Sequence, residues 1–215
     1  MLFETREHAA RLLARKLSAP YKGKNPLVLG IPRGAIPMAK IIADDLGGEL
    51  DVVLVHKLGY PGQPELAIGA IDETGNVFLS DYGLEIEPQY LELEKKQQLG
   101  VLRQRRARYT PGRLPINPRG RIVIVVDDGI ATGSTMTAAL RAIRRQEPKK
   151  LVGAVAVASA MAARAMSHEA DAMVCLDVPA DFYAVGQFFK DFSQVTDDDV
   201  VAILRQHEAQ IVAVG

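Results

Sequence analysis

Cysteine is nearly absent from this chain: among its 215 residues, only Cys175 is a cysteine. A single cysteine excludes an internal disulfide framework and a thiolate-rich zinc cage. Because Cys175 lies in the apolar run 172–176, we expect a small core residue there rather than a reactive thiol.

A net charge is also missing, since 26 lysines and arginines balance 26 aspartates and glutamates. A protein whose main task is to coat duplex nucleic acid would carry a large basic excess, so we expect no nucleic-acid partner. No apolar run approaches the ~18 residues of a membrane span, and residues 4–8 carry charges where a secretion signal needs its apolar stretch. These absences favour a cytoplasmic protein with no membrane partner.

The composition that is present is typical of a folded domain. Hydrophobic residues make up 48% of the chain and charged residues 24%, the balance of a globular protein. A chain of this size buries about 70% of its unfolded surface and needs no metal or disulfide to fold. We therefore expect residues 1–215 to form one domain.

Apolar runs of strand length recur along the chain, separated by amphipathic stretches and by glycine and proline. The expected strands cover 27–31, 52–55, 122–126, 151–157 and 172–176, and the expected helices between them cover 36–46, 135–145 and 160–167. Strands this uniformly apolar are covered on both faces, as in a parallel sheet between helices. The alternation predicts an α/β fold with a doubly wound parallel sheet.

Three segments do not fit the simple alternation. Residues 59–82 are rich in glycine and proline, and we expect a flexible loop that leads into a hairpin around the turn 74–76. Residues 88–108 predict an added, exposed helix. A capping box at Thr196–Asp199 predicts a C-terminal helix that ends near Gln210.

The main basic cluster, residues 103–108, lies at the end of this added helix. It can be a solvated helix end whose cations are favoured by the helix dipole, or a face turned toward a phosphate. The sequence leaves both interpretations open.

The most informative segment is 123–135, VIVVDDGIATGST. We interpret it as a buried strand that ends in two carboxylates, Asp127 and Asp128, followed by a small-residue loop and a helix start. In a parallel sheet, ligands bind beyond the carboxyl ends of the strands. Successive backbone N–H groups at Thr132–Thr135 would form an anion cradle for a phosphate monoester, and the acids beside it suit sugar hydroxyls or a metal. Together they predict a site for a ribose 5-phosphate.

A simpler interpretation exists for each half of this motif. Asp-Asp-Gly is a common turn, and Ser134 and Thr135 could serve only as helix caps. The two halves occur together directly after the strongest strand, which favours the ligand site.

Segment 123–135 resembles the phosphoribosyl-diphosphate (PRPP) signature of the type I phosphoribosyltransferases. Two further segments strengthen the resemblance: 30–35 (GIPRGA) stands where that family has its pyrophosphate loop, and 56–62 (HKLGYPG) is similar to the start of its catalytic flap. Residues 64–70 and 183–194 resemble a bacterial subgroup of phosphoribosyltransferases whose acceptor the subgroup name does not give.

The resemblance implies a role for each matching residue. Asp127 and Asp128 would bind the ribose hydroxyls, and would hold Mg²⁺ directly or through those hydroxyls and water. The 5-phosphate would bind to Ala131, Thr132, Gly133, Ser134 and Thr135, and the pyrophosphate to Arg33, Gly34 and Lys57, with Arg33 and Lys57 acting in catalysis. His56 stands where the adenine-type enzymes have an arginine, so its role stays open. Related enzymes have a cis, non-proline peptide in the pyrophosphate loop, and we expect the Pro32–Arg33 bond to be cis or to become cis when ligand binds.

The activity that the resemblance implies is a glycosyltransferase reaction of nucleotide metabolism. The phosphoribosyl group of PRPP would pass to a small-molecule acceptor, a nitrogenous base, with release of pyrophosphate and with Mg²⁺ as cofactor. The hypoxanthine-guanine enzymes have an aspartate where this chain has Ala131, and that departure disfavours a 6-oxopurine acceptor. A flap and hairpin at about 57–82 and a hood at about 178–215 would cover the site.

Some alternatives stay open. The same fold also serves non-catalytic PRPP-binding regulators, whereas the fingerprints of other nucleotide-binding α/β families are missing from the sequence. Five aromatic residues of the hood could stack on a planar base or could attach the C-terminal helix to the sheet; they are Phe182, Tyr183, Phe188, Phe189 and Phe192. The sequence names neither the acceptor nor the oligomeric state, for which a homodimer is one candidate.

Overall fold

The computed structural model describes residues 1–214, with all of their side chains except those of 64–65, 81–82 and 211–214. In chain order its elements are α1 (Arg6–Tyr21), β1 (Leu27–Gly30), α2 (Ile36–Leu46), β2 (Glu49–Val52), β3 (Val55–Tyr60), β4 (Gln63–Asp72), β5 (Val77–Leu79), the 3₁₀ turn η1 (Asp81–Glu85), α3 (Pro88–Tyr109), β6 (Ile122–Ile130), α4 (Ser134–Arg144), β7 (Lys150–Ala158), α5 (Ala160–Met166), β8 (Ala172–Asp177), the 3₁₀ turn η2 (Val185–Phe188) and α6 (Asp197–Val214).

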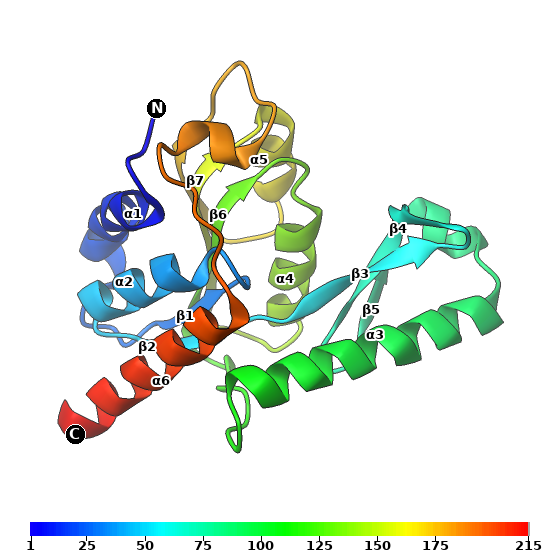
Figure 1. Cartoon of the computed structure of the whole chain (residues 1–215), viewed down its shortest axis with the longest axis horizontal. Helices are drawn as coiled ribbons and strands as arrows, with labels where there is room; N and C mark the ends of the chain where they lie inside the picture. The colour runs from blue at the N-terminus through cyan, green and yellow to red at the C-terminus, as the bar shows by residue number, and fades with distance from the viewer. Residues whose placement is uncertain (215) are drawn as a thin grey trace.

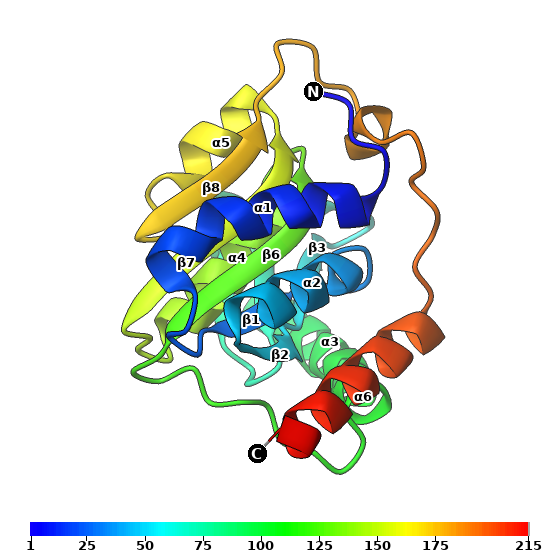
Figure 2. The same ribbon diagram turned by 90° about the vertical axis from the view of Figure 1, so that its left-hand side faces the viewer.

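Five parallel strands form the central sheet in the order β2–β1–β6–β7–β8. Helices α1 and α2 cover one face of this sheet, and α4 and α5 cover the other, as Figure 2 shows. The sheet is therefore doubly wound, and the predicted fold class is confirmed.

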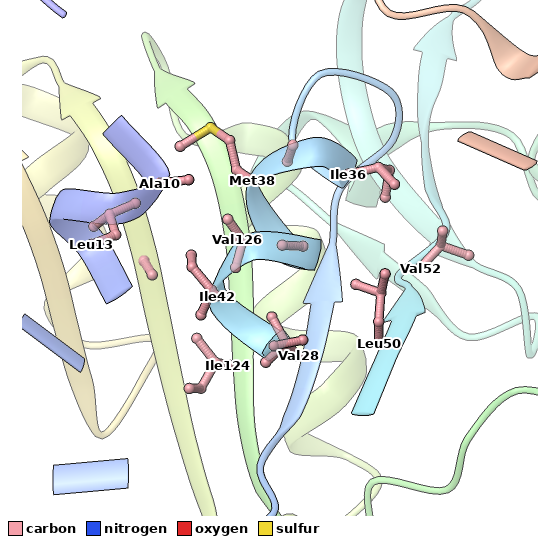
Figure 3. Packing of buried hydrophobic residues seen from close by; sticks show 14 of the residues in the cluster. Ala10, Leu13, Val28, Ile36, Met38, Ile42, Leu50, Val52, Ile124 and Val126 are labelled. Carbon is pink, nitrogen blue, oxygen red and sulfur yellow. The ribbon is translucent and has the colours of Figure 1, made fainter. Parts of the chain in front are cut away.

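Alternate residues of the central strands belong to two separate hydrophobic cores, one on each face of the sheet. On the first face, Val28 of β1 and Ile124 and Val126 of β6 pack with residues of α1 and α2, among them Ile42 (Figure 3). On the second face, residues such as Val125 pack with α4. Complete burial of an aliphatic side chain contributes ~1.5–3 kcal/mol, so the uninterrupted apolar runs of these strands stabilise both layers at once.

A second, antiparallel sheet of β3, β4 and β5 extends away from the central sheet together with α3 (Figure 1). The expected hairpin turn at 74–76 is confirmed between β4 and β5. The prediction of a flexible loop before this turn is wrong, because β3 and β4 pair with each other through most of residues 59–72. Leu58 and Ile68 are fully buried, so this segment contributes to the apolar core.

Three other boundaries differ from the prediction. The strand expected at 52–55 is divided, because β2 ends at Val52 and β3 begins at Val55, where the chain passes to the second sheet. Helix α6 continues to Val214 beyond the expected end at Gln210, behind a capping box that is confirmed by reciprocal bonds between Thr196 and Asp199. The strand expected at 122–126 continues to Ile130.

Helix α1 has no counterpart in the prediction. Thr5 caps it by accepting a hydrogen bond from the backbone of His8, and Leu13 and Leu17 are fully buried against the sheet. No helix in the described part of the chain is both long and apolar enough to span a bilayer.

Candidate active site

Neighbouring strands β1 and β6 carry the chain away from the middle of the sheet in opposite directions. The chain after β1 leads through α2 to β2, whereas the chain after β6 leads through α4 to β7 and β8. A parallel sheet binds ligands at such a switch point, beyond the carboxyl ends of the strands. The loops 31–35 and 131–133 both leave the sheet at this point, so the topology brings together the two segments that the sequence singled out.

The two acidic residues lie inside β6 and not after its end, which corrects the sequence interpretation. β1 stops at Gly30, opposite Val126, whereas β6 stays paired with β7 as far as Ile130. On the side of β1, the neighbour of Asp127 and Asp128 is therefore no strand but the loop 31–35. Because β1 is shorter than β6 at this edge, the two carboxylates lie next to that loop.

Asp128 has a buried cationic partner that the sequence analysis did not single out, Arg6 at the start of α1. The Nε of Arg6 donates to Oδ2 of Asp128 over 2.9 Å, and the two side chains are 10% and 14% exposed. The same guanidinium donates to the carbonyl oxygen of Ser193 at 2.7 Å and lies 3.7 Å from the ring centroid of Phe192. Arg6 thus joins the acid on β6 to the segment that precedes α6.

Both carboxyl groups are held in surroundings that disfavour their charge. Burial raises the pKa of Asp128, against the hydrogen bond from Arg6. Burial and the neighbouring charge of Asp128 raise the pKa of Asp127 well above its usual value, although the backbone N–H of Asp128 donates to it over 2.9 Å. One arginine compensates two adjacent acids, so the pair would gain from additional hydroxyl donors or from a cation.

The donor set at this point fits Mg²⁺. That ion binds to proteins through one or two carboxylates and completes its octahedron with water and substrate oxygens. Asp127 and Asp128 supply two such carboxylates, and among the described residues no group of three or more His, Cys, Asp or Glu side chains could hold a metal alone. Any Mg²⁺ bound here would therefore be shared with a substrate.

The loop after β6 places a glycine at the N-cap of α4. Gly133 precedes the helix with a φ of 81°, a left-handed conformation that glycine adopts without steric cost. The hydroxyls of Thr132 and Ser134 lie 3.2 Å apart and hydrogen-bond to each other, and the backbone N–H of Ser134 donates to the Thr132 hydroxyl over a long 3.5 Å. Ser134 and Thr135 thus do not act as the N-cap, and the following N–H groups of the first turn of α4 are available to an anion.

The loop after β1 contains a cis peptide bond between Pro32 and Arg33, as predicted. Arg33 is half-exposed, and its nearest carboxylate is Asp197 at 4.0 Å, the first residue of α6. A Cβ atom added to Gly34 would overlap Oδ2 of Asp128. The absence of a side chain at Gly34 therefore lets the loop lie directly against the carboxylate of β6.

This contact gives a first testable prediction. Gly34→Ala should weaken PRPP binding by about tenfold, or ~1.4 kcal/mol, because the added methyl group must displace the Asp128 carboxylate. Gly100→Ala is a matched control, since a Cβ there meets no atom within 4 Å. Calorimetric titration with PRPP checks the result, and equal affinities for the two variants would contradict the role of Gly34.

A cavity of about 710 Å³ lies between Asp128, the loop 31–35 and the segment before α6. Arg33, Gly34 and Asp128 line one part of it, and Val185 and Phe192 of the segment before α6 line another. Gly129 lies directly under this segment, because a Cβ atom there would be 2.6 Å from a methyl group of Val185. The cavity is therefore lined by charged groups of Arg33 and Asp128 and by an apolar part at Val185 and Phe192, whereas Gln194 and Asp197 of the same hood add polar groups to its wall.

The hood aromatics pack against one another and against the N-terminal segment. Phe189 lies beside Phe3, at a centroid distance of 5.3 Å, and beside Phe192, at 5.0 Å, and the same core cluster includes Val200 and Leu204 of α6. Phe182 pairs with Phe188. Tyr183 is 87% exposed, and of the five aromatics only Phe192 lines the cavity of 710 Å³.

Lys57 lies apart from Arg33. Together with His56 it lines a separate cavity of about 320 Å³, whose other walls include Ser134 and Thr135. The Nδ1 atom of His56 lies 2.8 Å from the carbonyl oxygen of Lys57. The structure thus brings Lys57 to the side of the phosphate loop, whereas Arg33 and Gly34 line the cavity beside Asp128.

The basic cluster at the end of α3 has more than one role. Arg106 is nearly buried and donates to Asp51 at 2.8 Å and to Glu73 at 2.6 Å, which anchors α3 and the antiparallel sheet to β2. Arg108 pairs with Asp197 and Asp198 at the start of α6. Arg105 lines the cavity of 710 Å³ together with Arg33.

A family model described as "Phosphoribosyl transferase domain" matches residues 2–192, most of the chain. The chain therefore belongs to the phosphoribosyl transferase domain family, as the sequence motifs predicted.

Individual relatives are similar to this chain over most or all of its length. The crystal structure of TT1426 from Thermus thermophilus is 47% identical and has a TM-score of 0.86, with 96% of this chain and 99% of that chain covered. Two Mycobacterium tuberculosis proteins, "Putative phosphoribosyl transferase MT0597" (strain CDC 1551 / Oshkosh) and "Putative phosphoribosyl transferase Rv0571c" (strain ATCC 25618 / H37Rv), are each 42% identical over 217 residues. These matches cover all of this chain but 49% of each relative, so the chain spans about half the length of the curated relatives it matches.

Proposed function

We propose that this protein transfers the 5-phosphoribosyl group of PRPP to a nitrogenous base, with release of pyrophosphate. The observation that carries the proposal is the arrangement on β1 and β6. A buried carboxylate pair, a helix start with glycine as its N-cap and a loop with a half-exposed arginine meet at one switch point of the sheet. These three parts match the ribose, the 5-phosphate and the pyrophosphate of PRPP in their chemistry.

In the proposed reaction, a ring nitrogen of the acceptor forms a bond to the anomeric carbon of PRPP. The bond from that carbon to the pyrophosphate oxygen breaks, the electron pair leaves with pyrophosphate, and the proton of the nitrogen is released to solvent. Positive charge grows on the sugar and negative charge on the leaving group. The protein contributes by stabilising these charges and by excluding water.

Each part of the site has a role in this proposal. Asp127 and Asp128 hold the ribose hydroxyls, the backbone N–H groups of 132–135 hold the 5-phosphate, and Arg33 and Gly34 meet the pyrophosphate. Lys57 lines a cavity with Ser134 and Thr135 of the phosphate loop, and the proposal assigns it to the 5-phosphate of the substrate. Mg²⁺ bound with Asp127 and Asp128 would neutralise charge on the substrate oxygens.

The acceptor binds, in this proposal, at the apolar side of the cavity of 710 Å³, against Val185 and Phe192. Ala131, at the start of the phosphate loop, offers no acid to a 6-oxopurine, which favours other bases. A base acceptor would place the protein in nucleotide metabolism.

A pyrophosphate-release assay tests the activity. The protein is incubated with PRPP, Mg²⁺ and one acceptor at a time from a panel of purines, pyrimidines and small amines. We expect release with at least one base, and a strong loss of release in Arg33→Ala without loss of folding. PRPP binding without release for any acceptor would instead identify a non-catalytic PRPP-binding regulator, and no PRPP binding at all would contradict the proposal.

A further inference from the structure

The C-terminal end of α3 meets the N-terminal end of α6 beside the loop 31–35. Tyr109, the last residue of α3, donates its hydroxyl to Asp197 of α6 over 2.6 Å, and Arg33 of the loop lies 4.0 Å from the same carboxylate. Figure 1 shows these two helix ends approaching each other below the central sheet. An added helix far from β1 in the sequence thus reaches the candidate pyrophosphate loop.

Two arginines at this helix end already form ion pairs. Arg106 pairs with Asp51 and Glu73, and Arg108 pairs with Asp197 and Asp198 at 2.8 and 2.9 Å. Arg105 differs from both, because none of the ion pairs among the described residues includes it. It is exposed, and it lines the cavity of 710 Å³ together with Arg33 and Gly34.

Not all of the positively charged side chains that line this cavity are neutralised by a short ion pair. Arg6 is paired with Asp128 at 2.9 Å, so these two charges offset each other. Asp197 lines the cavity too, but its short contacts are to Arg108 and Tyr109, and it holds Arg33 only loosely. Arg33, whose contact to Asp197 is 4.0 Å long, and Arg105, which is in no ion pair among the described residues, therefore remain as two guanidinium groups on different elements of one cavity.

A pyrophosphate group needs more than one cation. It carries several negative charges, and guanidinium groups bind phosphate oxygens through paired, charge-assisted hydrogen bonds. Lys57, which the sequence assigned to this task, lines the other cavity with Ser134 and Thr135. Beside the charge that Mg²⁺ would supply, the side-chain cations available to a pyrophosphate in the cavity of 710 Å³ are therefore Arg33 and Arg105 of α3.

We propose that Arg105 binds the pyrophosphate group of the substrate together with Arg33, so that α3 supplies the second cation for the leaving group. This inference rests on the proposed function, because it assumes PRPP in the cavity. It assigns one member of the basic cluster 103–108 to the substrate, whereas Arg106 and Arg108 hold the helix in place.

The test compares Arg105→Gln with Arg103→Gln. Arg103 is exposed on the same helix two residues earlier, and it does not line the cavity, so the two variants lose the same charge at different places. Affinities for PRPP and for ribose 5-phosphate are measured by calorimetry in Mg²⁺, and the quantity compared is their ratio. Ribose 5-phosphate lacks the pyrophosphate, so this ratio isolates contacts to the leaving group.

We expect Arg105→Gln to lower the ratio of PRPP to ribose 5-phosphate affinity by about fivefold or more, as for loss of a hydrogen-bonded charge contact. Arg103→Gln should leave the ratio unchanged, and Arg105→Lys should restore part of it. Equal ratios in Arg105→Gln and Arg103→Gln would overturn the inference, as would equal losses for both ligands in Arg105→Gln. A wild-type protein that binds neither ligand would instead overturn the proposed function itself.

Discussion

Replacement of Arg6 by methionine should lower the free energy of unfolding by about 3 kcal/mol, the low end of the cost of breaking a buried ion pair. The variant leaves the Asp128 carboxylate without its counter-charge in a place where it is 14% exposed. It also removes the hydrogen bond to the carbonyl of Ser193 and the stacking of the guanidinium on Phe192. The low end of the range applies because Asp128 lines a cavity that water can enter.

Arg121→Met is the matched control for this experiment. Arg121 also donates to one carboxylate, Glu49 at 2.7 Å, and to one carbonyl, that of Asn25 at 3.2 Å. That pair is more exposed, at 22% and 31%, so its loss should cost ~1 kcal/mol or less. Urea unfolding measures both variants. An Arg6→Met protein as stable as Arg121→Met would show that the contact at Asp128 does not stabilise the fold.

The second large effect is on ligand binding. Asp127→Asn combined with Asp128→Asn should weaken PRPP binding in Mg²⁺ by at least ~2 kcal/mol, about thirtyfold, since hydrogen bonds to charged groups contribute ~1.5–3 kcal/mol each. Calorimetry provides the measurement. Unchanged PRPP affinity in the double variant would remove the ribose assignment of these two residues.

The single variant Asp127→Asn separates binding from folding. Burial and the charge of Asp128 raise the pKa of Asp127, which means that the ionised group destabilises the folded chain at neutral pH. The neutral, isosteric amide should therefore leave the stability to urea equal or higher while PRPP affinity falls. A variant that loses stability and affinity together would indicate a structural carboxylate instead.

The central sheet was predictable because its strands are buried on both faces. A run such as 122–126 offers no polar face, and only a strand between two helical layers can bury all of it. The second sheet was less predictable, because glycine and proline in 59–69 look like loop residues. Leu58 and Ile68 are buried through contacts between segments that lie far apart in the sequence, among them the strands of this sheet, α3 and α4. The amino-acid composition of a segment does not predict its contacts with distant parts of the chain.

In the candidate site, too, some residues could be predicted from the sequence and others could not. Asp127, Asp128 and the loop 131–135 were visible because they are contiguous and follow a strand. Arg6 was not, since its partner lies 122 residues away, and its only local signal is the capping residue Thr5 before it. The roles within the six-residue basic cluster could not be told apart by sequence. Arg105, Arg106 and Arg108 point in different directions from α3, so that Arg106 and Arg108 meet different carboxylates and Arg105 lines a cavity.

The most direct test of the account is a crystal structure of the protein with PRPP and Mg²⁺. The account predicts the 5-phosphate on the backbone N–H groups of 132–135, the ribose hydroxyls on Asp127 and Asp128, and the pyrophosphate against Gly34 and Arg33. PRPP bound elsewhere, or bound here with its pyrophosphate end on the phosphate loop and Arg33 turned to solvent, would contradict it.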